Sequence, residues 1–228
     1  MSDLTTLLES HHLPYRSVIP FDLTAGGPVV FDFTATSSDF AHIDINDVTG
    51  FTGRLFDRIA EAEIPVGIGR YNEDRVLSRP SPLFNGEAVR RSVHLGIDLF
   101  VTEGTEVMTP LPCRIQSVAD NAGLGNYGPT VILEHELEDT RFWTLYGHLG
   151  RDSVFHLDIG AELIAGETFA EIGEHTENGG WPPHLHFQII SDLGDHTGDF
   201  PGVAAPTERD HWLGICPDPN LILGIPHL

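Results

Sequence analysis

Two segments that lie far apart in the chain each alternate between apolar residues and residues that can bind a metal ion. The first is Val93-His-Leu-Gly-Ile-Asp-Leu99 and the second is Pro183-His-Leu-His-Phe-Gln-Ile189. A period of two is typical of a β-strand, so we expect the apolar residues of each segment on one packed face and the polar residues on the other. Imidazole and carboxylate groups without a thiolate favour zinc among the divalent cations.

The candidate ligands of this divided site are His94, Asp98, His184 and His186. Four filled positions are typical of structural zinc, whereas three protein ligands and one open position are typical of catalytic zinc. Because His184 and His186 are two residues apart on one predicted strand, their ring nitrogens need not converge on a single ion. One of them can bind the ion while the other acts beside the open position as an acid, a base or an oxyanion donor. Both kinds of site stay open at this point.

A further histidine stands in Phe142-Trp-Thr-Leu-Tyr-Gly-His-Leu149, where we expect Tyr146 and His148 on one strand face. A histidine that does not bind the metal can position a water molecule and accept or supply a proton. Tyr127, in Gly125-Asn-Tyr-Gly128, is either part of a substrate groove or a residue of a hairpin turn.

The rest of the chain predicts a mainly β protein with an antiparallel sheet or sandwich. From Arg91 onward, short apolar stretches alternate with Gly, Pro, Asn and Asp and show almost no helical periodicity. Residues 1–90 differ: they contain one amphipathic helix, predicted over 47–63 with Asp47 as its N-cap, and a turn-rich connector at 79–86. We expect residues 1–90 to form an α+β extension packed on a core domain at 91–190. Residues 191–228 are expected to wrap around that domain, as ordered coil from Asp199 to Leu228.

Composition excludes several classes of function. The 228 residues include twelve cations, all arginine, and the net charge is -22, which argues against nucleic acid and anionic membranes as partners. Without lysine the chain can form neither a P-loop nor a Schiff base, and it cannot be a lipoyl carrier. The acidity reflects either solubility in a saline habitat or selection of a cationic or neutral peptide. Cys113 and Cys216 are expected to be buried free thiols, with a disulfide as the alternative.

The N-terminal residues lack the basic start and apolar stretch of a secretory signal, and no apolar run reaches the roughly 20 residues that span a bilayer. We therefore expect a soluble, cytoplasmic protein. The sequence assigns no oligomeric state.

The ordered set of motifs resembles the lysostaphin/LytM-type zinc metallopeptidases, which include peptidoglycan endopeptidases. Their pattern of His-x-x-x-Asp, an isolated His and then His-x-His is matched by His94-Leu-Gly-Ile-Asp98, His148 and His184-Leu-His186. The likeness covers residues 91–190 and extends to glycine turns and strands like those of the family's duplicated, lipoyl-like core. Many relatives have Glu where this chain has Gln188, and Trp181 with a doubled proline alters the rim of the site.

The resemblance implies one zinc ion held by His94, Asp98 and His186, with a water molecule at the fourth position. His148 and His184 would then be the catalytic histidines that do not bind the metal, and the reaction would be hydrolysis of a peptide bond in a peptide or muropeptide-like substrate. The alternative is a non-catalytic binding or regulatory module on the same fold, although such relatives usually lose ligands and this chain keeps them all.

Overall fold

A large sheet carries both halves of the predicted site. The computed structural model describes residues 3–11, 14–37, 40, 47–75 and 90–228. Its eight strands follow one another in space in the order β1 (Val29–Phe31), β2 (Gly67–Gly69), β4 (Ile97–Phe100), β11 (Leu185–Ile190), β8 (Thr140–Gly147), β7 (Gly128–Leu137), β6 (Cys113–Asn121) and β9 (Glu162–Leu163). All neighbouring pairs are antiparallel except β1 and β2, which are parallel. The prediction of a mainly β protein is confirmed.

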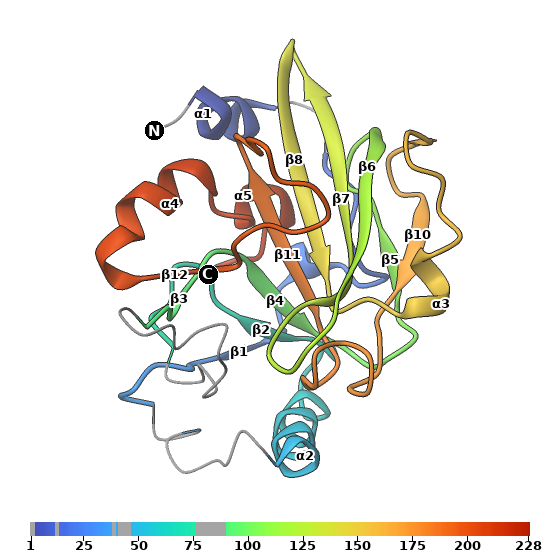
Figure 1. Ribbon diagram of the computed structural model, residues 1–228. Coiled ribbons are helices and arrows are strands. Elements are labelled where there is room, and N and C mark those ends of the chain that lie inside the picture. The colour runs from blue at the N-terminus through green and yellow to red at the C-terminus, as the bar shows by residue number, and fades with distance from the viewer. Residues whose placement is uncertain (1–2, 12–13, 38–39, 41–46, 76–89) are drawn as a thin grey trace.

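Two short strand pairs complete the β-structure of the described residues. β5 (Glu106–Met108) pairs with β10 (Thr168–Glu171), and β3 (Val93–His94) pairs with β12 (Val203–Ala204). Figure 1 shows β5 and β10 beside β6 and β7, whereas β3 and β12 lie beyond the end of β4. The second pair holds His94 close to the sheet.

The second metal-binding segment adopts the alternation that its sequence predicts. Leu185, Phe187 and Ile189 of β11 belong to the larger hydrophobic cluster. His186 and Gln188 project from the opposite face of the same strand, and both are buried. One face of β11 therefore forms core and the other carries chemistry, as expected for a period of two.

The first segment is not a single strand, so that prediction is wrong. The chain leaves β3 after His94, bends at Gly96 and enters β4 at Ile97. Val93 and Leu95 consequently pack in a different cluster from Ile97 and Leu99. A Cβ atom at Gly96 would lie 2.6 Å from the His186 ring and 2.8 Å from the carbonyl oxygen of Phe187, so only glycine fits at this bend.

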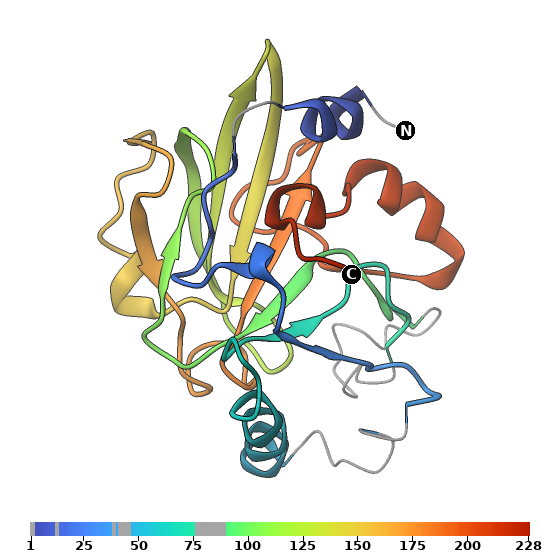
Figure 2. The same cartoon turned by 180° about the vertical axis from the view of Figure 1, so that it is seen from behind.

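The described part of the N-terminal region contributes two strands to the large sheet, two α-helices and the short 3-10 helix η1 (Leu23–Ala25). The predicted helix is confirmed as α2 (Val48–Ile59), and the Asp47 side chain accepts a hydrogen bond from the Gly50 N–H at 3.0 Å. α1 (Asp3–Ser10) lies at the other end of the molecule (Figure 2). The buried residues of α2 pack in one cluster with aromatic rings of β1 and β4; its members are Phe31, Phe33, Phe40, Phe51, Leu55, Ile59 and Phe100. The boundaries at residues 90 and 190 stay predictions, and the predicted connector at 79–86 lies outside the described residues.

The C-terminal region is partly helical, so the prediction of ordered coil is wrong. After β12 come η2 (Pro206–Glu208), α4 (Arg209–Ile215) and α5 (Asn220–Leu223), and α5 packs against α1. Pro206 is the first residue of η2, and Gly224 ends α5 in the left-handed conformation with φ 63°. Proline at a helix start and glycine just past its end are the signals that favour such short helices. No helix in the described ranges, α3 (Arg151–Val154) included, is long and apolar enough to cross a bilayer.

Leu55→Ala tests the packing of α2. The Leu55 side chain is fully buried, so its truncation leaves a cavity in the cluster that α2 forms with the aromatic rings. It should lower the free energy of unfolding by about 2–5 kcal/mol. Arg54→Ala, at an exposed position of the same helix, is the control and should stay within about 0.5 kcal/mol of wild type. Equal stability of the two variants in chemical denaturation would show that α2 does not pack as described.

His135 predicts a pH dependence of stability. Burial lowers the pKa of His135 to about 4, while its ring bonds to Thr144 Oγ1 at 2.7 Å and to the Pro112 carbonyl oxygen at 3.1 Å. Because the unfolded chain takes up this proton near pH 6.5, stability falls as the pH drops from about 6.5 towards 4, by on the order of 3 kcal/mol. His135→Gln keeps a polar side chain but cannot titrate, so in urea titrations of chelator-treated protein its stability should fall less over this range. An unchanged pH slope would exclude this role.

Candidate metal centre

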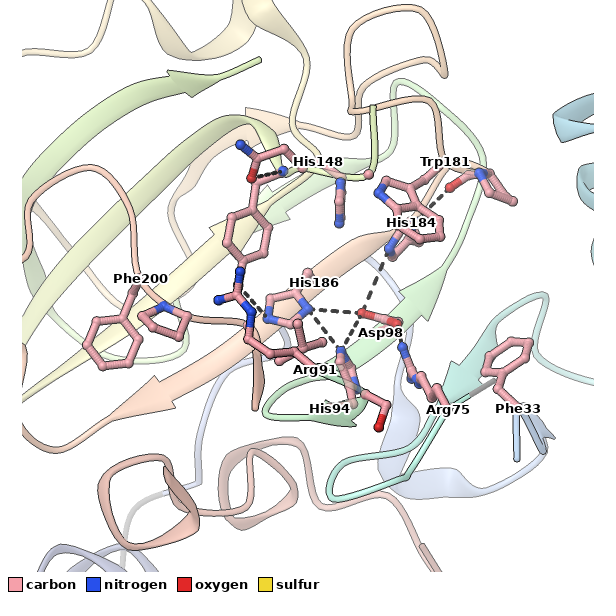
Figure 3. A pocket seen from close by; sticks show the side chains of 18 of the residues that line it. Phe33, Arg75, Arg91, His94, Asp98, His148, Trp181, His184, His186 and Phe200 are labelled. Atoms are coloured by element: carbon pink, nitrogen blue, oxygen red, sulfur yellow. Dashed lines mark hydrogen bonds and ion pairs between the residues drawn. The ribbon is translucent and has the colours of Figure 1, made fainter. Parts of the chain in front are cut away.

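Three of the predicted site residues bring one atom each to a common point. His94 Nε2 and His186 Nδ1 are 3.1 Å apart, and each lies 3.1–3.2 Å from Asp98 Oδ1. His94 comes from β3, Asp98 from β4 and His186 from β11, where His186 is paired directly with Asp98 across the ladder. All three side chains are buried. Figure 3 shows them converging below His148 and His184.

Outer hydrogen bonds determine which ring nitrogens carry protons. His94 Nδ1 faces the carbonyl oxygen of Arg70 at 2.9 Å, and since a carbonyl can only accept, this nitrogen carries the hydrogen. Gln188 donates its amide N–H to the Pro201 carbonyl, so its Oε1 accepts from His186 Nε2 at 2.9 Å. The inward atoms, His94 Nε2 and His186 Nδ1, therefore both present lone pairs.

Burial and the neighbouring Arg75 lower the pKa of His94 to about 4, which keeps that ring neutral near pH 7. Burial alone would raise the pKa of Asp98, but His94 and Arg75 beside it hold that pKa well below its usual range. The cluster therefore presents three electron-pair donors, one of them anionic.

This donor set fits a divalent cation. Three lone-pair atoms at mutual distances of 3.1–3.2 Å repel one another unless a positive charge lies between them. In a tetrahedral site with metal–ligand bonds of about 2.0 Å, ligand atoms are about 3.3 Å apart, which is close to the spacing found here. Outer hydrogen bonds that fix the tautomer of each ligating histidine are typical of protein metal sites.

The two predicted catalytic histidines lie next to each other beside this cluster. The ring centroids of His148 and His184 are 4.2 Å apart, and His184 Nε2 lies 3.8 Å from Asp98 Oδ1. Each ring donates a hydrogen bond from Nδ1 to a backbone carbonyl oxygen. The acceptor is Asn178 for His148, at 2.8 Å, and Pro182 for His184, at 2.7 Å. Burial lowers the pKa of both rings, so both are neutral with a lone pair on Nε2.

His148 reaches this position by a route that its sequence pattern does not predict. It follows the end of β8 with φ 65°, in the left-handed region, and so is not on a strand face shared with Tyr146. Tyr146 instead belongs to the hydrophobic core. The backbone of His148 is held by hydrogen bonds to the Tyr127 carbonyl at 2.9 Å and from the Gly173 N–H at 2.9 Å.

A cavity of about 260 Å³ opens onto the five site residues. Aromatic rings make much of its wall; they belong to Phe33, Phe51, Phe100, Tyr127, Trp181 and Phe200. Tyr127 packs between His148 and His186, at ring-centroid distances of 5.7 and 5.1 Å. Burial raises the pKa of Tyr127 well above its usual range, so its hydroxyl stays protonated and can donate a hydrogen bond. Tyr127 lies in the loop that joins the antiparallel strands β6 and β7 and also lines the cavity, so the hairpin position is observed and a role towards substrate stays a prediction.

The sequence pattern does not predict two residues of the site, Arg75 and Asn178. Arg75 bonds Asp98 Oδ2 through Nη1 at 2.6 Å, although nothing in its spacing from Asp98 signals this contact. Asn178 is fully buried and accepts from both the His148 ring and the Trp181 backbone N–H. Its position in the run Asn178-Gly-Gly-Trp181 signals a turn, but not which histidine the turn supports.

Comparison with known proteins finds similar sequences for part of the chain. Residues 92–197 match the model of peptidase family M23. A stretch of 147 residues, 62% of this chain, is 31% identical to an uncharacterized metalloprotease of Haemophilus influenzae, and it spans only 28% of that relative's length.

Two solved structures that match the chain have lower sequence identity. The catalytic domain of lysostaphin from Staphylococcus simulans has 23% identity and a TM-score of 0.41, with 61% of this chain and 88% of that one covered. A zinc-containing peptidase from Vibrio cholerae has 24% identity and a TM-score of 0.39, with 53% and 32% covered. The family resemblance predicted from the sequence is confirmed over residues 92–197 by the family match.

Proposed function

We propose that the protein is a zinc-dependent metalloendopeptidase that hydrolyses a peptide bond in a peptide or muropeptide-like substrate. The match of residues 92–197 to peptidase family M23 supports this proposal. The observation that supports this best is the combination of three lone-pair donors around one point with two further neutral histidines beside them. A purely structural site would have no use for an adjoining cavity or for two neutral imidazoles beside the three donors.

In this proposal His94, Asp98 and His186 hold one zinc ion. When bound, zinc would polarise the peptide carbonyl and lower the pKa of a water molecule. His148 and His184 supply the proton transfer: each has its Nδ1–H committed to a backbone carbonyl, so each Nε2 is free to accept a proton from the attacking water. The protonated ring can then donate to the developing oxyanion or to the leaving amine. Tyr127 supplies a further hydroxyl donor from the cavity wall.

A cleavage assay tests the proposal. Zinc-loaded protein, incubated with glycyl peptides and with muropeptides and analysed by mass spectrometry, should cleave an internal peptide bond. A chelator should abolish cleavage and added zinc should restore it. Failure of the zinc-loaded protein to hydrolyse any of these substrates would favour the non-catalytic module, and a protein that also purifies without zinc and gains no stability from it would confirm that alternative.

Removing a ligand should remove the metal. His94→Ala, Asp98→Ala and His186→Ala should each bind much less than one zinc ion per chain, as measured by elemental analysis after dialysis. Asp199→Ala is the control, because Asp199 lines the same cavity without contributing to the cluster. Full zinc content in Asp98→Ala would exclude the proposed ligand set.

The two remaining histidines should separate binding from catalysis. His148→Ala and His184→Ala should keep one zinc ion per chain but lose on the order of a hundredfold in rate, since loss of one such donor removes about 3 kcal/mol of transition-state stabilisation. His175→Ala, at an exposed position, is the control and should match wild type. Loss of zinc in either variant would reassign that histidine as a ligand.

A further inference from the structure

The segment that runs from β2 to Arg75, in the N-terminal region, lies against the proposed metal centre. It contacts the backbone of His94 twice: the Asn72 N–H donates to the His94 carbonyl at 2.8 Å, and the His94 N–H donates to the Glu73 carbonyl at 3.0 Å. The Arg70 carbonyl accepts from the His94 ring. The same short segment therefore controls both the position and the tautomer of one proposed ligand.

Arg75 performs the corresponding task for Asp98. Its Nη1 bonds Asp98 Oδ2 at 2.6 Å, whereas Oδ1 of the same carboxylate faces the two histidines. The guanidinium is itself held in place, by Glu73 Oε2 at 3.1 Å, by the Arg70 carbonyl at 3.3 Å and by the Phe33 ring, whose centroid is 5.2 Å from Cζ. Figure 3 shows Arg75 between Asp98 and Phe33, on the side of Asp98 away from the histidine rings. Only 13% of its side chain is exposed.

Gly69 makes this contact possible. It pairs with Asp98 in the β2–β4 ladder, and a Cβ atom there would lie 2.6 Å from Arg75 Nη2. Any side chain at position 69 would occupy the space through which the guanidinium reaches the carboxylate. The β2–β4 pairing, the absence of a side chain at Gly69 and the hydrogen bond that Glu73 accepts therefore all favour the contact between Arg75 and Asp98 Oδ2.

We infer that Arg75 is a positioning residue of the metal centre: it occupies Asp98 Oδ2, so that the carboxylate can offer the metal Oδ1 alone. The inference rests on the proposed metal-binding function. A carboxylate freed from Arg75 can rotate or bind through both oxygens, and either change alters the number of positions left for a substrate. The N-terminal region, to which the sequence assigns no role, would then be part of the centre.

Metal affinity tests the inference. We expect Arg75→Gln to weaken zinc binding about 10- to 100-fold in competition with a chromophoric chelator, as is typical when an outer hydrogen-bond partner of a ligand is lost. Arg75→Lys keeps the charge but loses the planar fork that also bonds Glu73, so it should weaken binding as well. Arg114→Gln, an exposed cation paired with the exposed Glu162, is the control and should leave affinity unchanged.

The opposite result is equally informative. If Arg75 acts only through its positive charge, Arg75→Gln should bind zinc more tightly than wild type and Arg75→Lys should match wild type. Either outcome would overturn the inference. If wild-type protein binds no zinc at all, the proposed function fails instead, so the two failures are distinguishable.

Two further measurements keep the test valid if Arg75→Gln is unstable. Gly69→Ala should displace the guanidinium without deleting it and weaken zinc binding. The double variant of Gly69→Ala with Arg75→Lys should bind no more weakly than the weaker of these two single variants, because both changes break one contact. Cobalt-substituted protein reports the coordination directly, since four-coordinate Co²⁺ absorbs visible light more strongly than five- or six-coordinate Co²⁺. A weaker band in Arg75→Lys than in wild type is expected, and identical spectra would contradict the role of Arg75 in holding Asp98.

Discussion

The register between β4 and β11 is the constraint on which the centre depends. His186 lies directly opposite Asp98 in this antiparallel ladder, so their side chains leave the same face of the sheet at adjacent positions. A shift of one residue would turn one of them into the hydrophobic core, because side chains alternate between the two faces. Leu185, Phe187 and Ile189, buried on the other face, specify the register. The apolar pattern of the strand therefore fixes the geometry of the polar one.

The two halves of the site differ in how far the sequence predicts them. In the second half, the regular alternation of the sequence agrees with the observed strand. β11 lies between β4 and β8 inside the sheet, so its apolar residues meet the core on one face and its polar residues lie on the other. In the first half, a straight strand would separate residues 94 and 98 by about 13 Å along the chain, too far for both to reach one ion. The bend at Gly96 removes this distance. It is stabilised by backbone bonds to Asn72, Glu73 and Gly202, which lie elsewhere in the sequence and leave no local signal.

His148 illustrates a second limit of pattern reasoning. Its sequence context predicts a strand face, yet the residue adopts φ 65° just past β8, a conformation that costs a non-glycine residue free energy. Backbone hydrogen bonds with Tyr127 and Gly173 hold it there. The strand ends before the histidine, and the left-handed backbone turns its ring towards His184. The order of the motifs thus predicted that His148 lies near the other site residues, whereas strand periodicity predicted its backbone conformation wrongly.

Gln188 shows how a departure from the family pattern agrees with the surrounding charges. A glutamate there would also accept from the His186 ring, but its second oxygen would face the Pro201 carbonyl and the Cys216 sulfur, which the amide N–H groups of Gln188 contact at 3.1 and 3.3 Å. A carbonyl oxygen facing a buried carboxylate would be unfavourable, and the amide of Gln188 instead donates to that carbonyl. A neutral residue also leaves Asp98 as the only anion that bonds His186 in the part of the chain that the structure describes. Because Arg75 lies against that same anion, the charge of the proposed centre is controlled at Asp98 by a residue outside the three proposed ligands.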